Sequence, residues 1–417
     1  MSNKIKIPEP LLFLSRIVVG LVFIFSGFVK GIDPLGFTYK LQDYFTAFNL
    51  VFLQNTALPL AILLILAEFL VGISLFFKLR IKWGAWGGLI FMIVFTPLTL
   101  ILALTNPVTD CGCFGDAIVI TNWQTFYKNF VIIIFAIIVF IGKNQYRPSY
   151  HSITEWSVLL AFSVFLIGIN IYGLNHLPLV DFRPYKLGIS IYEGMEVPED
   201  APQDGYKTIL IYEKDGVQKE FNEENFPWQD STWKFVDQNS YLVEEGYKPP
   251  LHDFLIVSDN GEEITDKVLS NPEYTLLLFS QNLAKANIKG IQEANNLALY
   301  CNENQIPFYG ISASGENEIN NLRNETELNF GFATMDETAI KTIIRSNPGL
   351  VMLKGDVIIG KWAWKDIPDP EVFSGNMLSS QIIGFNRDKN SWRVIGLSIS
   401  IHTTPQLKLM MTPQKTY

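Results

Sequence analysis

Apolar residues in the first 175 positions form five long runs separated by short polar segments. A helix needs about 20 mostly apolar residues to cross the hydrocarbon core of a bilayer. The pattern therefore predicts an α-helical membrane bundle with five transmembrane helices over residues 1–175. The predicted spans are residues 11–29, 57–77, 83–104, 124–142 and 157–173.

From residue 176 the pattern changes to short strand-like and helix-like segments. We interpret residues 176–250 as a linker followed by a β-rich extension, with a hairpin at the Asp215-Gly216 turn. Residues 226–250 are aromatic and irregular, and we expect them to pack against the next module. Residues 251–370 predict an α/β domain, and residues 371–417 form a tail without a clear pattern.

The α/β prediction is based on alternation within residues 251–370. Short apolar runs predict strands, and segments with helical periodicity lie between them. The predicted strands are 252–257, 274–279, 307–312, 330–333, 350–354 and 357–362, and the predicted helices are 284–302, 316–324 and 337–344.

Composition supports this division of the chain. Residues 1–175 hold 11 Lys/Arg and 7 Asp/Glu, whereas residues 176–417 hold 21 and 34. Only 18% of all residues are charged, against about 25% in soluble proteins. An apolar, basic first part and an acidic second part indicate a membrane domain joined to a soluble one. The acidic second part excludes nucleic acid as a partner, because nucleic acid binds basic surfaces.

Lys and Arg in the short loops predict the orientation in the membrane. Seven of them flank one side of the five spans. Only Lys30, Lys40 and Lys128 lie toward the other side. We therefore predict a bacterial inner-membrane protein with a cytoplasmic N-terminus and a periplasmic C-terminal domain.

Arg16 and Glu68 are ionisable residues that lie within the first and second predicted spans. A charge at the bilayer centre costs at least about 2.5–3.5 kcal/mol, so such groups usually pair or line a cavity. Their distances from the helix ends put them roughly 6 Å apart in depth. An Arg16–Glu68 pair would form the polar floor of a cavity for a quinone-like or lipid ligand. Alternatively, Arg16 extends to the headgroups and Glu68 is protonated.

Two of the three cysteines, Cys111 and Cys113, stand together in a loop that the orientation places in an oxidising compartment. A disulfide across the single residue Gly112 would close a small, strained ring, which favours easy reduction. A structural disulfide and two idle thiols are the alternatives. Zinc needs four ligands, and no histidine is near in sequence, so we expect no metal site. The third cysteine, Cys301, lies in the helical stretch 288–303 and is expected in the core.

The residues of the first part also carry a resemblance to a known family. Several of them follow the pattern of DoxX-like membrane proteins, namely Arg16, Gly20, Phe23, Ser26, Gly27, Lys30, Asp33, Pro34, Gly36 and Glu68. The run Cys111-Gly112-Cys113-Phe114-Gly115-Asp116, followed by Trp123, Phe126 and Asn129, resembles the MauE branch of that group. The whole layout resembles a Bacteroidota-type DoxX protein with a periplasmic extension.

The resemblance implies disulfide formation or electron transfer to periplasmic proteins, beside a thioredoxin-like partner. DoxX-like relatives also imply quinone chemistry. No cofactor is certain from the residues themselves, and a quinone is the one that the resemblance suggests.

The order of strands and helices over residues 251–370 resembles a thioredoxin-like domain. Pro348 matches the cis-proline that shapes the peptide-binding groove of that family. The two cysteines of the family's CxxC motif fall at Ala284 and Asn287, so this domain lacks CxxC and cannot exchange dithiols itself. We therefore expect a docking module that binds partners through Asn347 and Pro348 and through Trp228 and Trp233 of the extension.

Two functions follow from these observations. In the first, Cys111 and Cys113 form a membrane thiol–disulfide relay, and the thioredoxin-like domain presents a periplasmic client. In the second, the protein is a non-enzymatic envelope assembly or scaffold protein that binds complex subunits through its periplasmic domain. Membrane lipids surround it in both. A transporter is a weaker hypothesis, because five spans show no inverted repeat.

Overall fold

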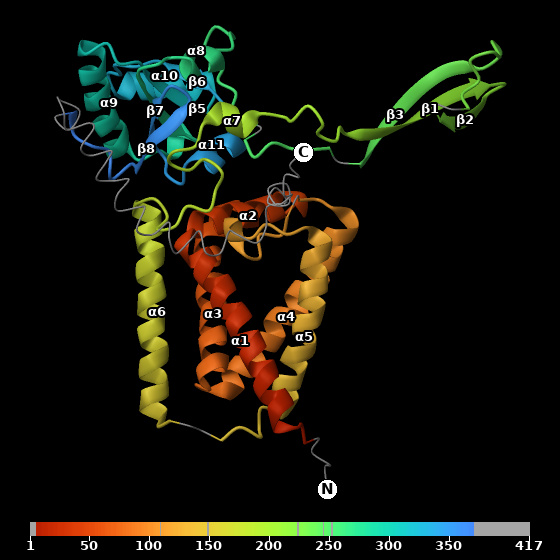
Figure 1. Ribbon diagram of the computed structural model, residues 1–417, viewed down its shortest axis with the longest axis vertical. Helices are drawn as coiled ribbons and strands as arrows, with labels where there is room; N and C mark the ends of the chain where they lie inside the picture. Colours follow the sequence, from red (N-terminus) through yellow and green to blue (C-terminus); the bar gives the residue numbers. More distant parts are fainter. Residues whose placement is uncertain are drawn as a thin grey trace, which may run out of the picture.

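The computed structural model describes residues 6–108, 110–147, 150–222, 225–244, 246–251 and 253–370. The predicted tail, residues 371–417, lies outside the described residues. Within the described part, five helices are long and apolar enough to cross a membrane. They form a bundle that carries the α/β domain at one end (Figure 1). We call that end of the bundle the domain side.

All five predicted spans are confirmed as helices: the second matches its predicted bounds, and the other four are slightly longer than predicted. A sixth, shorter helix, α2 (Pro34–Ala47), lies on the domain side (Figure 1). It begins at Asp33, whose carboxylate accepts a hydrogen bond from the Gly36 N–H and so caps the helix. The five long helices are α1 (Glu9–Ile32), α3 (Ala57–Phe77), α4 (Ile81–Thr105), α5 (Asn122–Gly142) and α6 (Ser152–Asn175).

Helices α1 and α3 are antiparallel and packed backbone to backbone. A Cβ at Gly27 would lie 2.8 Å from the Phe69 amide nitrogen, and one at Gly72 would lie 2.6 Å from the Ile24 nitrogen. Only glycine permits so close an approach between two helices. The contact fixes which residues face one another, and this decides the ion pairs described below.

The α/β domain contains a five-stranded sheet in the order β6-β5-β4-β7-β8. Strand β4 pairs in parallel with β5, and β5 with β6, whereas β7 and β8 are antiparallel. This mixed order is that of a thioredoxin-like domain, as predicted. The strands are β4 (Tyr274–Ser280), β5 (Phe308–Ser312), β6 (Phe332–Thr334), β7 (Gly349–Lys354) and β8 (Val357–Ala363).

Helices cover both faces of this sheet. Leu276 and Leu278 of β4 face a core shared with α9 (Ile288–Glu303) and α10 (Glu316–Glu325), while Leu277 and Phe279 face the opposite core. That second core includes α8 (Thr265–Leu269), α11 (Glu337–Ile343) and α7 (Ile191–Met195) of the linker. Alternate residues of a strand point to opposite faces, so a wholly apolar β4 indicates a central strand.

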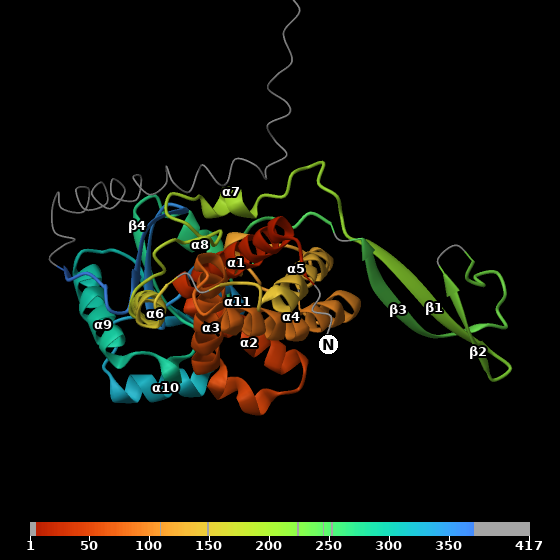
Figure 2. The same cartoon turned by 90° about the horizontal axis from the view of Figure 1, so that it is seen from below.

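A separate three-stranded sheet, in the order β2-β1-β3, follows the linker. The predicted hairpin is confirmed as β1 (Gly205–Lys214) and β2 (Val217–Asn222). The predicted irregular, packed region is wrong in two respects. Residues Lys234–Glu244 form the regular strand β3, and the sheet projects away from the α/β domain (Figures 1 and 2).

The predicted strand at residues 252–257 is also wrong for the part that the structure describes. Only Val257 makes isolated bridges there, to Glu263 and to Thr334. The apolar side chains Phe254 and Ile256 are nevertheless buried in the core. The segment is apolar because it fills the core, although no neighbouring strand pairs with it along its length.

Candidate functional site

The loop Asp110–Asp116 lies on the domain side of the bundle and contains a disulfide between Cys111 and Cys113. Two helices hold its backbone. The Tyr44 hydroxyl of α2 donates to the Cys111 carbonyl at 2.5 Å, and the Ser26 hydroxyl of α1 donates to the Cys113 carbonyl at 2.6 Å. Gly112 has a φ of +61°, a conformation that favours glycine.

The two sulfur atoms have different surroundings. Cys111 is 5% exposed, and Cys113 is half-buried. The Cys113 N–H donates to the Cys111 sulfur at 3.3 Å, and the Thr125 hydroxyl oxygen lies 3.5 Å from the same sulfur. The Thr125 hydroxyl itself donates to the Thr121 carbonyl, so the Cys113 N–H is the donor at this sulfur, and such a donor favours a negative charge there. Cys111 is therefore the better leaving group, and Cys113 is the better point of attack.

Both cysteines line a cavity inside the bundle. It holds about 730 Å³ of empty space, its open mouth included. Its walls are mostly apolar and come from α1, α4 and α5, with Phe23, Phe95, Leu98 and Ile132 among them. The polar groups that line it are Ser26, Lys30, Tyr44, Glu68, Thr99, Lys128 and Asn129. An apolar cavity with a few polar groups is typical of a binding site for a small ligand.

The polar floor of this cavity is an ion pair between Lys30 and Glu68. The Lys30 ammonium lies 2.7 Å from the Glu68 carboxylate, and the side chains are 5% and 12% exposed. Lys30 also lies over the Phe37 ring. Lys30 belongs to α1 and not to the loop that the loop-charge pattern predicts for it. Its sequence signals are its position immediately after the apolar run that ends at Val29 and its place in the DoxX-like pattern.

The predicted Arg16–Glu68 pair is wrong. Arg16 instead donates to the carbonyl oxygens of Leu75 and Phe76 at the end of α3, and it does not line the cavity. Because Gly27 faces Phe69, Glu68 lies opposite the region of Lys30. Arg16 is more than ten residues away along α1, roughly 20 Å at 1.5 Å per residue.

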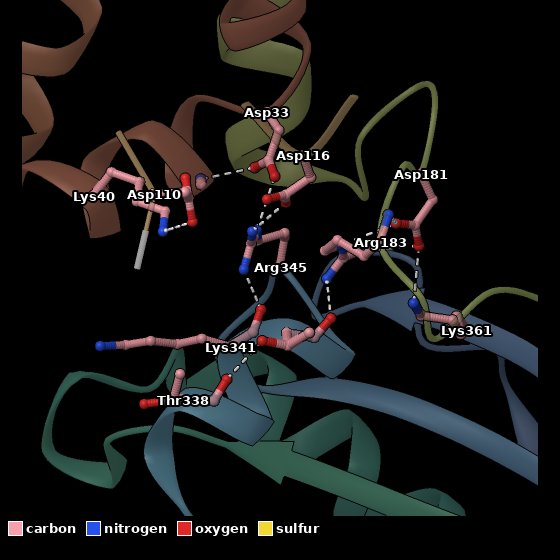
Figure 3. A network of polar contacts seen from close by, with 12 residues as sticks. Asp33, Lys40, Asp110, Asp116, Asp181, Arg183, Thr338, Lys341, Arg345 and Lys361 are labelled. Atoms are coloured by element: carbon pink, nitrogen blue, oxygen red, sulfur yellow. Dashed lines mark hydrogen bonds and ion pairs between the residues drawn. The ribbon is translucent and has the colours of Figure 1, made fainter. Parts of the chain in front are cut away.

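On the other side of the loop, the thioredoxin-like domain contacts the bundle through Arg345 (Figure 3). Its Nε donates to Asp33 and its Nη2 to Asp116, both at 2.8 Å. Burial disfavours the charged guanidinium, but the two carboxylates outweigh burial and raise the pKa of Arg345. Tyr39 of α2 lies against Arg345 and Lys341.

The position of Arg345 brings two predicted sites together. Arg345 stands three residues before Pro348, and the Asn347–Pro348 peptide bond is cis, as the thioredoxin-like resemblance predicts. Asp116 stands three residues after Cys113. The proline loop of the α/β domain is therefore docked beside the disulfide loop. Sequence reasoning missed Arg345, because nothing local marks a loop arginine as a contact to another domain.

The linker is fixed to the α/β domain by buried charges. Asp181 accepts hydrogen bonds from Arg183 at 2.8 Å and from Lys361 at 2.9 Å (Figure 3). Burial alone would raise the pKa of Asp181, but Lys361 and Arg183 outweigh burial and hold it well below its usual range. Pro178 and residues 180–183 of the linker, together with the loop glycines Gly112 and Gly115, line an outer cleft.

The α/β domain has no cysteine pair of its own. Ala284 lies in a short 3₁₀ turn, and Asn287 begins α9 as its N-cap. The Asn287 N–H donates to the Asn347 carbonyl at 2.9 Å, while the Asn347 side chain donates to the Asn282 carbonyl at 2.8 Å. Cys301 is buried in the core, as predicted, and burial raises the pKa of its thiol to about 12.

The two tryptophans predicted to bind partners lie on the projecting sheet. Trp228 is 72% exposed, whereas Trp233 packs edge-on against Phe221. Both belong to the segment between β2 and β3, at the end of the sheet that projects away from the bundle and from the α/β domain (Figures 1 and 2). The structure therefore does not bring these tryptophans together with Asn347 and Pro348 in one site.

Comparison with known proteins agrees with this description of the first part. Residues 8–142 match the family model of the methylamine utilisation protein MauE. Residues 8–142, which include four of the five long helices, are therefore similar to MauE. Residues 206–245, which contain the projecting sheet, match a domain of unknown function (DUF8463). No curated protein sequence matches the chain.

Solved structures that are similar to this chain over its α/β domain include the following three. One is a secreted Mycobacterium tuberculosis disulfide oxidoreductase homologous to E. coli DsbE, with 15% identity and a TM-score of 0.24 over 30% of this chain and 96% of that chain. Another is a putative protein disulfide isomerase from Bacteroides thetaiotaomicron, with 12% identity and a TM-score of 0.24 over 32% of this chain and 84% of that chain. The third is a Thermus thermophilus thio-disulfide isomerase, with 15% identity and a TM-score of 0.21 over 27% of this chain and 81% of that chain. Such low scores carry no argument about activity.

Proposed function

We propose that this MauE-like protein is a membrane thiol–disulfide oxidoreductase whose reacting group is the Cys111–Cys113 disulfide. The observation that carries the proposal is the position of that disulfide. Its sulfur atoms line the bundle cavity, while the proline loop of a thioredoxin-like domain is docked beside it through Arg345. The proposal includes the orientation expected from the loop charges, with this domain in the bacterial periplasm. The wider DoxX-like relationship belongs to the same proposal.

The reaction would proceed by two exchanges. A client thiolate attacks Cys113, a client–Cys113 bond forms, and the electron pair of the broken sulfur–sulfur bond moves to Cys111. A second client thiolate then attacks the client sulfur, which releases Cys113 and an oxidised client. The chain is left with two reduced cysteines, which must pass two electrons and two protons to an acceptor.

A quinone fits the role of acceptor by chemical class. It takes up two electrons and two protons, and it dissolves in the apolar phase that surrounds the cavity. The apolar lining and the Lys30–Glu68 pair support such a ligand. Of the residues predicted to bind it, Glu68 lines the cavity and Arg16 does not.

Trapping tests the proposal. In cells, the Cys113 thiolate of Cys111→Ser can attack the disulfide of an oxidised client, which forms a mixed disulfide and releases one client thiolate, the reverse of the second exchange. Cys113→Ser lacks the thiol that forms this bond. We expect client adducts with the first variant and far fewer with the second, on a Cys301→Ser background. For the acceptor, the reduced protein in lipid nanodiscs is mixed with ubiquinone-1, and free thiols are counted. No client adduct with either variant, together with no thiol loss on addition of quinone, would sink the proposal.

One observation favours the second function, a non-enzymatic scaffold. The projecting sheet exposes large apolar side chains, among them Trp228, Phe235 and Tyr241. Exposed aromatic residues are typical of binding surfaces. If Cys111→Ser has no effect in cells while deletion of residues 205–244 abolishes function, the scaffold role replaces the relay.

A further inference from the structure

Lys128 of α5 is the third charged residue in the wall of the bundle cavity. The other two, Lys30 and Glu68, neutralise each other at 2.7 Å. Within the described part of the chain, no carboxylate lies within ion-pair distance of the Lys128 ammonium. Instead it lies 4.1 Å from the centre of the Phe114 ring, and Phe114 directly follows Cys113.

This arrangement places an uncompensated positive charge in an apolar cavity. A charge within a membrane protein is costly unless something pairs with it. A contact between an ammonium and an aromatic ring recovers only about 0.5–2 kcal/mol. The cavity is therefore electrostatically prepared for a negative charge that the oxidised protein does not supply.

Reduction supplies such a charge. When the disulfide opens, a thiolate forms on a sulfur that lines the same cavity as Lys128. We propose that Lys128 is a positioning residue that stabilises the Cys111 thiolate and so makes the disulfide easier to reduce. This inference rests on the proposed function and names a residue that sets the reduction potential of the Cys111–Cys113 disulfide.

The other groups that face the sulfur pair do not replace Lys128. They are the Lys30–Glu68 pair from α1 and α3 and the neutral Tyr44 hydroxyl from α2, which donates to a carbonyl. From α4, the described lining residues carry no titratable side chain. Lys40 pairs with Asp110 at 2.6 Å. Lys128 thus remains the unneutralised cation in the cavity wall.

The test measures the thiol pKa and the redox equilibrium of the purified full chain in nanodiscs, without client or quinone. On a Cys301→Ser background, alkylation rates against pH give the thiol pKa, and equilibration with glutathione gives the redox constant. Lys128 stands about one helical turn after Thr125, whose hydroxyl oxygen lies 3.5 Å from the Cys111 sulfur, and a nearby opposite charge shifts a pKa by about one to three units. Lys128→Met should therefore raise the lowest thiol pKa by at least one unit. It should also make the disulfide at least tenfold harder to reduce, which is about 30 mV for a two-electron couple.

Two variants make the result specific. Lys128→Arg keeps the charge and should restore both values. Lys143→Met removes a lysine that also contacts an aromatic ring, Phe140, at the other end of α5, and should change neither. If Lys128→Met does not fold, Lys128→Gln replaces it.

An unchanged thiol pKa in the neutral variant overturns the inference. A change that Lys128→Arg does not restore overturns it too, because it would show a packing role. Failure of the client and quinone experiments would instead contradict the proposed function, since neither the alkylation nor the glutathione measurement depends on them.

Discussion

Replacing Arg345 by methionine removes the charge that joins the thioredoxin-like domain to the bundle. The Arg345 side chain is 7% exposed and lies 2.8 Å from the carboxylates of Asp33 and Asp116 in the bundle. The variant leaves both carboxylates without this contact. Breaking a buried pair by removing one partner costs about 3–5 kcal/mol. Because Asp116 is 34% exposed, water compensates in part, and we expect about 2 kcal/mol. That is roughly a thirtyfold loss in the docking equilibrium.

Hydrogen–deuterium exchange of the full chain in nanodiscs measures this loss. Peptides covering residues 110–117 and 341–347 should exchange faster in Arg345→Met, while peptides from α9 should not change. Arg323→Met is the matched control, because Arg323 lies on α10 of the same domain and its described contact is to Asn320. In the double variant with Asp116→Asn, the second change should add little, since the two residues share one contact.

Two results would refute this reasoning. Equal exchange at residues 110–117 in the variant and the wild type would mean that other contacts hold the domain in place. Strictly additive effects of Arg345→Met and Asp116→Asn would mean that the two residues do not act through each other.

Three further predictions concern buried groups. Lys30→Met or Glu68→Gln alone should destabilise the protein in micelles by about 3–5 kcal/mol, and the double variant by less than the sum, as measured by thermal unfolding. Asp181→Asn should destabilise by a similar amount at pH 7. Because the Asp181 pKa is lowered in the folded state, that stabilisation is present above about pH 4 and is lost as the pH falls below it. The wild type should therefore lose stability more steeply than Asp181→Asn between pH 5 and pH 2 in denaturant titrations. Cys301, with a thiol pKa raised to about 12, should stay unmodified by iodoacetamide at pH 8 in mass spectra, while the reduced Cys111–Cys113 pair reacts.

The sequence predicts elements better than it predicts contacts. Apolar runs specify the five spans, because length and hydropathy alone decide whether a helix can cross a bilayer. Strand β3 escapes prediction, since Asp237, Gln238, Asn239 and Ser240 interrupt its apolar pattern. Helix α2 escapes it too, because a short surface helix with one buried face lacks the length of a span.

For the same physical reason, the sequence predicts the local motifs of the candidate site but not its long-range contacts. The cysteine pair is visible as a local motif, and the cis proline follows from a resemblance. The partner of Glu68 depends on the register of α1 against α3, which is set by contacts such as that of Gly27 with Phe69. Arg345 and Asp116 are 229 residues apart in sequence, and no local pattern reports a contact over that separation.

The tripeptide Cys111-Gly112-Cys113 contributes to the linings of both the outer cleft and the bundle cavity. Gly112 lines the outer cleft, both cysteines line the bundle cavity, and Lys30 and Phe37 contribute to the two linings. In the proposed reaction, the client and the acceptor would both react with the same two sulfur atoms. Each oxidation of a client would leave the pair reduced until an acceptor reoxidises it, so the two half-reactions would alternate.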